Sequence, residues 1–420
     1  MTNQEQLKYE INHNSKDHST LLTFTTPIKA GSPELDLLIV EIARDAEKRR
    51  RTDDRSHPYY AIDLIRQSRL GALRLPEELG GGGASIRDLF YVVIRLAEAD
   101  PDVAHILRTH FNFVEKFLLS PKNEVRDTRL VRVAEGAIFG NAITEISSRN
   151  VGSLDVVYET TLSPDCDGYR LNGTKYFSTG TLYADFVGVR ASTSEGLPVN
   201  VIIPTNREGV VLEDDWDGIG QKLTGSGTTR LNNVFVNTEE ILEGIHDQFQ
   251  FNSLLQLYLQ AIIAGILRNV VSDAKALIQS RSRTYSHAAA DTGPADPQLQ
   301  QIIGQLSSSA FAAEAIVLAA ADAQDTLVNH VDDGVIDYAL DHNASLQAAQ
   351  AKVIVEDFAF KASTLLFDVG GASATKQSAN LDRHWRNIRT LASHNPTVYK
   401  SRTIGNYIVN GTDLPMNGYY

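Results

Sequence analysis

The spacing of apolar residues divides the chain into a helical part, a strand part and a second helical part. From Pro33 to about Glu135, apolar residues recur every three to four positions, as in LDLLIVEIARDAEKRRR and SIRDLFYVVIRLAEAD, which is the period of an amphipathic helix. Four consecutive glycines, Gly80 to Gly83, interrupt this pattern. The glycine run lacks the Lys-Ser/Thr of a phosphate-binding P-loop, so we interpret it as a turn between helices.

The pattern changes to the alternation of β-strands at about Gly136. The segment DVVYETTLSPDCDGYRLNGTKYFSTG alternates in this way, and its Asn172-Gly173 pair predicts a two-residue hairpin turn. From Phe251 onward the chain returns to long, Ala-rich helical segments, which are typical of a helical bundle. We therefore predict an α+β, mostly α protein with a mobile N-terminal tail (1–32), an N-terminal helical domain (33–135), a middle β-domain (136–245) and a C-terminal helical bundle domain (246–420).

Charge and composition exclude several classes of partner. The formal net charge of −13 over 420 residues argues against binding to nucleic acid or to an anionic membrane. No apolar run approaches the roughly 18 residues that span a bilayer, and the N-terminus lacks the apolar core of a signal peptide. The single cysteine, Cys166, forms no internal disulfide and belongs to no zinc-binding cluster. We expect a reducing, cytoplasmic location.

One short segment near the C-terminus concentrates polar chemistry. The sequence LDRHWRNIRTLASHNP, from Leu381 to Pro396, follows a Gly-Gly break and contains one of the two tryptophans. Its arginines stand at spacing three, so they form one stripe along a helix. This stripe is either a row of surface ion pairs or part of a site. The basic residues are Arg383, His384, Arg386, Arg389 and His394.

The order of elements, together with several motifs, resembles the acyl-CoA dehydrogenase fold. In that fold an N-terminal helical domain, a middle β-barrel domain and a C-terminal four-helix bundle hold a flavin at their junction. The motifs here are NAITE, NGTKYFSTG, DWDGIG with TGSGTT, and FDVGGAS. The resemblance implies flavin-binding residues in these motifs and one arginine that reaches the cofactor of a neighbouring subunit, typically within a homotetramer. These residues are Asn141, Thr144, Glu145, Ser178, Thr179, Trp216, Ser226, Gly371, Ala372, Ser373 and the arginine Arg283.

The base of an acyl-CoA dehydrogenase is missing from its usual positions. Such an enzyme needs a carboxylate to remove a proton next to a thioester, and the family places a Glu about ten residues after the Gly-Gly turn. Leu381 stands there in this chain, and the other family position falls in Gln248 to Val271, which contains no Asp or Glu. Asp382 precedes Arg383 and is more simply its ion-pair partner. A dehydrogenase with a displaced base remains the alternative.

Two histidines lie in segments where the dehydrogenases of this fold have other residues. His394 lies in SHNP and His110 in AHILRTH. With DRHWRN, these residues resemble the flavin-dependent monooxygenases of this fold, of the dibenzothiophene monooxygenase and sulfur-acquisition type. The resemblance implies catalytic roles for His110 and His394, with the Thr179 hydroxyl near flavin N5. His105 lies five residues before His110 and therefore off its helical face, so we set it aside.

The resemblance also implies the cofactor, the partners and the reaction. Monooxygenases of this type receive reduced FMN from a separate NAD(P)H-flavin reductase and transfer oxygen from O2 through a flavin C4a-hydroperoxide. Arg283 suits the FMN phosphate because guanidinium binds phosphate by forked hydrogen bonds. FAD is less favoured, since TYSHAAADTG after Arg283 lacks the Phe-Gly of the FAD-dependent dehydrogenases. We expect an organosulfur substrate and a place in sulfur metabolism such as desulfurization. N- or C-hydroxylation, or a flavin-free binding protein, are the competing hypotheses.

Overall fold

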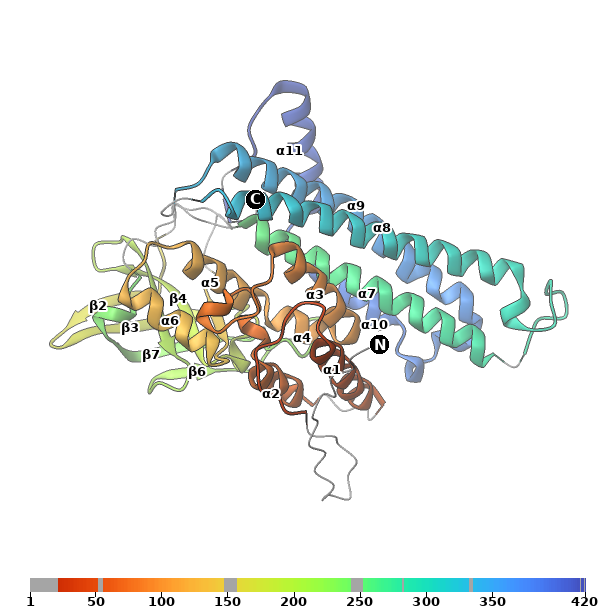
Figure 1. Ribbon diagram of the computed structural model, residues 1–420, viewed down its shortest axis with the longest axis horizontal. Helices are drawn as coiled ribbons and strands as arrows, with labels where there is room; N and C mark the ends of the chain where they lie inside the picture. Colours follow the sequence, from red (N-terminus) through yellow and green to blue (C-terminus); the bar gives the residue numbers. More distant parts are fainter. Residues whose placement is uncertain are drawn as a thin grey trace, which may run out of the picture.

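The structure is a computed structural model that describes residues 22–51, 56–146, 157–242, 252–281, 283–331, 335–415, 417–418 and 420. Helices come first, strands follow, and long helices end the chain (Figure 1). Most of the predicted tail, residues 1–21, and the predicted boundary at 245 lie outside the described residues. The division into four units therefore stays a prediction.

The first helices enclose an apolar core and are started by local caps. Ser85 begins α3 with a capping box to Asp88, and Asp100 caps α4 through its side chain just before Pro101. Leu107 joins α4 to α5 with helical dihedral angles, φ −82° and ψ −5°, so the two helices follow nearly one path. These helices are α1 (Pro33–Arg51), α2 (Tyr59–Ser68), α3 (Ile86–Ala99), α4 (Pro101–Ile106), α5 (Arg108–Leu119) and α6 (Glu124–Ala134).

The glycine run forms the predicted turn. The 3-10 helix η2 (Glu77–Leu79) ends at Gly80, where φ is 82°. A Cβ on Gly81 would lie 2.2 Å from the Leu75 carbonyl oxygen, so the close return of the backbone requires glycine there. The other 3-10 helices are η1 (Leu70–Ala72), η3 (Thr181–Tyr183), η4 (Thr238–Glu240), η5 (Gly293–Ala295), η6 (Gly371–Thr375) and η7 (Gln377–Ala379).

Within the described residues, seven strands form one sheet in the order β1-β4-β2-β3-β7-β6, with β5 paired to β4. Alternate residues face a small apolar core that includes Leu171, Val187 and Val201. The predicted turn at Asn172-Gly173 is wrong: both residues lie inside β3 at a register shift, and the turn falls at residues 166–167. The strands are β1 (Phe139–Ala142), β2 (Thr161–Asp165), β3 (Gly168–Lys175), β4 (Phe186–Thr193), β5 (Pro198–Pro204), β6 (Val210–Leu212) and β7 (Thr229–Val236).

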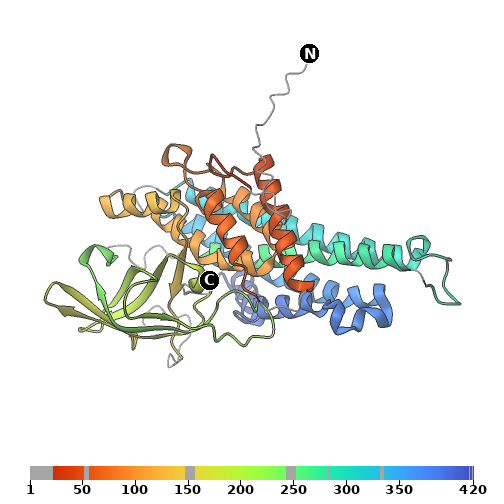
Figure 2. The same ribbon diagram turned by 90° about the horizontal axis from the view of Figure 1, so that it is seen from below.

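Long helices make up the rest of the molecule. They extend from the strands to the opposite end of the protein (Figure 2). The helices α7 and α8 are long and apolar enough to cross a membrane by length and composition alone, although most of α7 is buried inside the protein. These C-terminal helices are α7 (Asn252–Ser280), α8 (Pro297–Val328), α9 (Tyr338–Gly370), α10 (Asp382–Ala392) and α11 (Thr397–Asn410).

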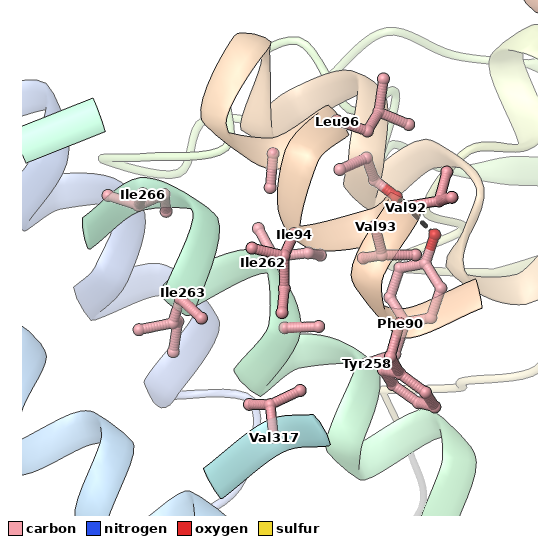
Figure 3. Packing of buried hydrophobic residues seen from close by; sticks show 14 of the residues in the cluster. Phe90, Val92, Val93, Ile94, Leu96, Tyr258, Ile262, Ile263, Ile266 and Val317 are labelled. Atoms are coloured by element: carbon pink, nitrogen blue, oxygen red, sulfur yellow. Dashed lines mark hydrogen bonds between the residues drawn. The ribbon is translucent and has the colours of Figure 1, made fainter. Parts of the chain in front are cut away.

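The main core joins the N-terminal helices to the long helices. Figure 3 shows Phe90 and Ile94 of α3 packed against Tyr258 and Ile262 of α7, with Val317 of α8 nearby. The hydroxyl of Tyr258 donates to the Ala104 carbonyl at 3.1 Å, which fixes α4 against the first turns of α7. The C-terminal end of α4 is therefore held firmly at the junction of the helices with the β-domain.

Candidate active site

A polar face runs along α4 and α5 through an otherwise apolar region. His105, Arg108, Thr109 and Asn112 stand at i, i+3, i+4 and i+7, so they lie on one side of the helical path, and all four are buried. His105 Nε2, Thr109 Oγ1 and Asn112 Oδ1 have no hydrogen-bond partner among the described residues. Buried polar atoms are usually paired. Three buried polar atoms without partners on one helical face indicate that this face contacts a ligand.

His105 is a neutral histidine with one nitrogen available. Its Nδ1 lies 3.0 Å from Gln221 Oε1, which is an acceptor, so Nδ1 carries the proton and Nε2 has a lone pair. Burial, followed by the nearby charge of Arg108, lowers the pKa of His105 to about 3. The Nε2 atom is thus a neutral acceptor on the polar face at neutral pH.

His394 lies beside this face, in the loop between α10 and α11. Arg108 Nη1 is 3.4 Å from His394 Nε2, and because guanidinium only donates, Nε2 is the acceptor. Burial and then the positive charge of Arg108 hold the pKa of His394 well below its ordinary value. The next residue, Asn395, donates to Gln256 Oε1 on α7 at 2.7 Å. Two neutral histidines from distant parts of the sequence therefore share one buried site.

Two loops of the β-domain carry predicted flavin-binding residues and are hydrogen-bonded to each other. Thr179 Oγ1 lies 2.8 Å from Ser226 Oγ, which lies 2.7 Å from Thr224 Oγ1. The indole of Trp216 donates to the Gln221 carbonyl at 3.0 Å. Because the Gln221 side chain also contacts His105, these loops continue the polar face of α4 and α5.

Close packing presses these loops against α4. Gly180 has φ 81°, and a Cβ there would lie 2.4 Å from the Ile106 carbonyl oxygen, so a side chain would push the loop away from the helix. Ser178 Oγ and Asn141 Oδ1, on neighbouring backbone, are buried without a hydrogen-bond partner in the described structure. These orphan atoms fit a polar, planar cofactor that both accepts and donates hydrogen bonds along its edge.

His110 does not face this site, which contradicts its prediction as a pocket residue. Its Nε2 lies 2.9 Å from the Gly71 carbonyl oxygen, and the Phe139 backbone N–H donates to its Nδ1 at 3.2 Å. A Cβ on Gly71 would lie 2.6 Å from Nε2, so glycine makes room for the ring. Both nitrogens are occupied, and burial lowers the pKa of His110 to about 4. His110 ties the helices to β1 instead.

The contacts of Glu145 among the described residues are all within the β-domain, whereas a contact with the cofactor was predicted. Its carboxylate forms a buried ion pair with Lys175 at 2.7 Å and accepts hydrogen bonds from Thr160 and from the Glu159 backbone. This side chain therefore points into the β-domain. Thr144 forms a β-bridge with Tyr176, next to the loop that carries Ser178 and Thr179, and its predicted contact with flavin stays a prediction.

The remaining predicted cofactor residues lie at the far end of the long helices. Arg283 is exposed, as are Ala372 and Ser373 in η6. They belong to one cluster, because Arg281 donates to the carbonyls of Arg283 and Val369, at the ends of α7 and α9. Gly371 lies in the same cluster, where its backbone approaches the Tyr285 hydroxyl. In Figure 2 these helix ends lie opposite the strands. A single chain does not bring this cluster to the polar face.

The arginine stripe of α10 is structural. Arg383 and His384 both bind Asp273 of α7, with His384 Nε2 2.7 Å from the carboxylate. Arg386 pairs with Asp382 at 2.8 Å. The interpretation of this stripe as ion pairs is therefore right, although Asp382 pairs with Arg386 and not with Arg383. The sequence position expected for a dehydrogenase base, Leu381, is buried in the apolar core.

Comparison with known proteins agrees with this geometry. The chain is 31% identical to a dibenzothiophene monooxygenase of Mycolicibacterium goodii over 364 residues, which cover 82% of this chain and 86% of that protein. The chain belongs to the dibenzothiophene monooxygenase family. Its residues 257–398 also match the family described as acyl-CoA dehydrogenase, C-terminal domain. The predicted fold class and the resemblance to these monooxygenases are confirmed.

Two solved structures are similar to this chain over almost their whole length. The FMN-bound structure of TdsC from Paenibacillus sp. A11-2 has a TM-score of 0.82 at 28% identity, covering 92% of this chain and 99% of that one. Methanesulfinate monooxygenase MsuC from Pseudomonas fluorescens has a TM-score of 0.82 at 25% identity, covering 93% and 100%. The first of these holds FMN and the second is named for an anionic sulfur compound.

Sequence reasoning missed three members of the site: His105, Arg108 and Gln221. The signal for the first two was present, because polar residues at i, i+3, i+4 and i+7 interrupt an apolar helix. The different helical faces of His105 and His110 were recognised, but the sequence alone favoured His110, with His394, and the structure places His105 beside His394 instead. Gln221 carries no such signal, since its role arises from the fold of the loop that contains Trp216.

Proposed function

We propose that the protein is a two-component monooxygenase that uses reduced FMN and O2 to oxygenate an organosulfur compound. The observation that carries this proposal is the pair of neutral, buried histidines, His105 and His394, at the junction of the helices with the β-domain. No carboxylate occupies either position at which a dehydrogenase of this fold keeps its base. Membership of the dibenzothiophene monooxygenase family supports the same reaction class.

The chain's own groups suit the handling of a proton in a site without water. When bound, reduced FMN supplies the oxygen-activating chemistry. Burial, followed by the charge of Arg108, keeps the His394 ring neutral, while His105 presents a lone pair at Nε2. A neutral imidazole can accept or donate a hydrogen bond at a position that a carboxylate would occupy with a negative charge. The burial of the polar face excludes competing water.

The FMN site combines two chains in this proposal. The loops with Thr179 and Ser226 contact the flavin of their own chain, together with Asn141, Ser178 and Trp216. The far-end cluster of Arg283 and η6 then contributes to the site of a second copy, with the guanidinium on the FMN phosphate. The apolar and largely exposed outer face of α8, on which Phe311 is 76% exposed, supports contact between copies in a homotetramer. Light scattering tests this: a monomer that turns over with full activity would contradict it.

The proposed partners follow from the need for reduced cofactor. A separate NAD(P)H-flavin reductase supplies FMNH2 by diffusion, and a cytoplasmic location provides NAD(P)H. The experiment combines the enzyme, a flavin reductase, FMN, NAD(P)H and ¹⁸O2 with sulfides, sulfoxides, sulfinates and thiophenes. We expect one ¹⁸O atom in the sulfur product by mass spectrometry. Labelled nitrogen or carbon products, or none, would contradict the sulfur assignment. Flavin reduction by an acyl-CoA without O2 would instead establish a dehydrogenase.

A further inference from the structure

We propose that Arg108 makes this site selective for an anionic sulfur substrate, a sulfinate, over a neutral thiophene or sulfide. This inference rests on the proposed function and names the substrate class of the same site. It begins from the position of one cation. Arg108 is buried on the polar face of α5, one helical turn after His105 and in contact with His394.

The Arg108 side chain is held in place and directed at the reacting region. Its Nε donates to the Leu255 carbonyl of α7 at 3.0 Å, and its Nη1 lies against His394 Nε2. Guanidinium remains charged at every physiological pH and presents donors in a planar fork. That fork matches two oxygens on one sulfur, as it matches a carboxylate or a phosphate. A sulfinate bound there would place its sulfur next to both neutral histidines.

Two buried lysines add partial positive charge in this part of the protein, although burial lowers the pKa of both, that of Lys400 to about 7. Lys352 donates to the Ala392 carbonyl at 3.2 Å and forms an ion pair with Glu356 on the same helix. Lys400 lies over the ring of Tyr420, with Nζ 3.3 Å from the ring centroid. Burial lowers the pKa of His394 most, and the positive charges of Arg108, Lys352 and Lys400 lower it further. Positive charge near the site stabilises an anion, while a neutral substrate gains little from it.

The orphan polar atoms point to the same conclusion. Thr109 Oγ1 on the polar face and Ser253 Oγ on the first turn of α7 are buried without a partner in the described part of the chain. Ser253 lies two residues before Leu255, whose carbonyl holds the Arg108 guanidinium. A flat, neutral thiophene offers these hydroxyls no strong hydrogen-bond acceptor and would leave them nearly unpaired, which is costly in a buried site. The oxygens of a sulfinate can accept hydrogen bonds from them.

The reaction with this substrate balances without a further reagent. A sulfinate, RSO2⁻, reacts with O2 and FMNH2 to give the sulfonate RSO3⁻, FMN and water. One oxygen atom forms a new bond to sulfur, the O–O bond breaks, and the second oxygen leaves as water with the two hydrogens of FMNH2. Sulfur is oxidised by two electrons and the flavin supplies the other two. The charge of the substrate is the same before and after, so Arg108 can hold both.

Binding of an unreactive product tests the inference without turnover. Ethanesulfonate and its neutral counterpart ethyl methyl sulfone are titrated separately into the FMN-loaded enzyme by calorimetry. We expect the sulfonate to bind at least about tenfold more tightly than the sulfone, and its affinity to fall with rising salt. Arg108→Gln should weaken sulfonate binding by about 10- to 100-fold, the range expected for losing a charged hydrogen bond, and leave sulfone binding unchanged. Arg95→Gln, on the outer face of α3, is the matched control and should bind both ligands as the wild type does.

The outcomes separate this inference from the proposed function. Arg108→Lys keeps the charge and should retain part of the sulfonate affinity, so it guards against a folding defect in Arg108→Gln. Equal affinity for sulfonate and sulfone, or sulfonate binding that Arg108→Gln does not change, would overturn the inference even if the enzyme oxygenates neutral sulfur compounds. Sulfonate binding that depends on Arg108 would support it even in an enzyme that oxygenates none of the sulfur compounds, an outcome that would overturn the proposed function alone.

Discussion

The two sides of the helical path α4–α5 carry one histidine each, and the two histidines differ in a single respect. His105 and His110 are both buried, and burial makes both neutral. His110 has backbone partners at both nitrogens, whereas His105 has one partner and leaves Nε2 open. Burial and a lowered pKa are therefore common to both histidines. What separates this pair is the Nε2 atom of His105, which has no partner among the described residues.

The largest effect that this comparison predicts concerns turnover. His394→Ala and, separately, His105→Ala should each lower substrate oxygenation by about 10² to 10⁴, the range of general acid–base contributions. Each removed ring leaves a cavity that lowers stability, so turnover is compared per folded molecule. The measurement is sulfur product formed per FMNH2 supplied, with peroxide release followed in parallel. His330→Ala, at the exposed end of α8, is the control. If His394→Ala still forms as much sulfur product per FMNH2 as the wild type, His394 has no role in the mechanism.

A second effect separates structure from cofactor binding at Glu145. Glu145→Gln removes the negative charge but keeps the shape, so the buried Lys175 ammonium loses its counterion. Breaking a buried pair in this way costs about 3–5 kcal/mol of the free energy of unfolding. FMN affinity of the folded protein, measured by flavin fluorescence, should not change. A variant of normal stability with weakened FMN binding would restore the original prediction of a cofactor residue.

His110→Ala should lower the stability of the protein and leave its oxygenation activity unchanged. It leaves the Gly71 carbonyl and the Phe139 N–H buried without their partners. Each lost partner costs about 1–3 kcal/mol, which thermal unfolding followed by circular dichroism can resolve. Oxygenation per folded molecule should match that of the wild type. If His110→Ala loses oxygenation but keeps its unfolding temperature, the contrast with His105 is wrong.

The last predicted effect is a dependence of stability on pH. The pKa of His105 is about 3 and that of His110 about 4 in the folded protein, against about 6.5 when unfolded. Between these values the unfolded chain binds more protons, so the free energy of unfolding falls as pH drops from 6.5 toward 4. Each histidine contributes about 1.4 kcal/mol per pH unit. Urea unfolding at several pH values should show a shallower slope in His105→Ala. An unchanged slope would contradict its burial as a neutral ring.

Much of the fold and half of the site follow from the sequence for identifiable reasons. The change of period near Gly136 and the return of helices near Phe251 are local properties, so the order of elements was predictable. Ser178, Thr179, Trp216 and Ser226 could be predicted because they lie in short motifs, and their role in binding flavin stays a prediction. What the pattern does not contain is the rotation of a helix about its axis, which packing decides, and so His110 was chosen over His105.

Two other errors have the same origin in tertiary structure. Asn172-Gly173 has the local preference for a hairpin, but pairing of β3 with β7 turns it into a register shift within a strand. Arg283 and Gly371 belong to recognisable motifs, yet a single chain places them far from the polar face. Their assignment to a cofactor depends on a second copy, which no local pattern describes.

The contact between Gly71 and His110 has a consequence for comparing relatives. Because a Cβ at position 71 would lie 2.6 Å from the imidazole Nε2, the two positions are not independent. A related sequence that replaces this glycine should also replace this histidine, and the reverse change is permitted. Position 105 has no such constraint from position 71. In an alignment of relatives, we therefore expect positions 71 and 110 to covary and positions 71 and 105 to vary independently. Such an alignment would distinguish the packing constraint on His110 from the environment of His105.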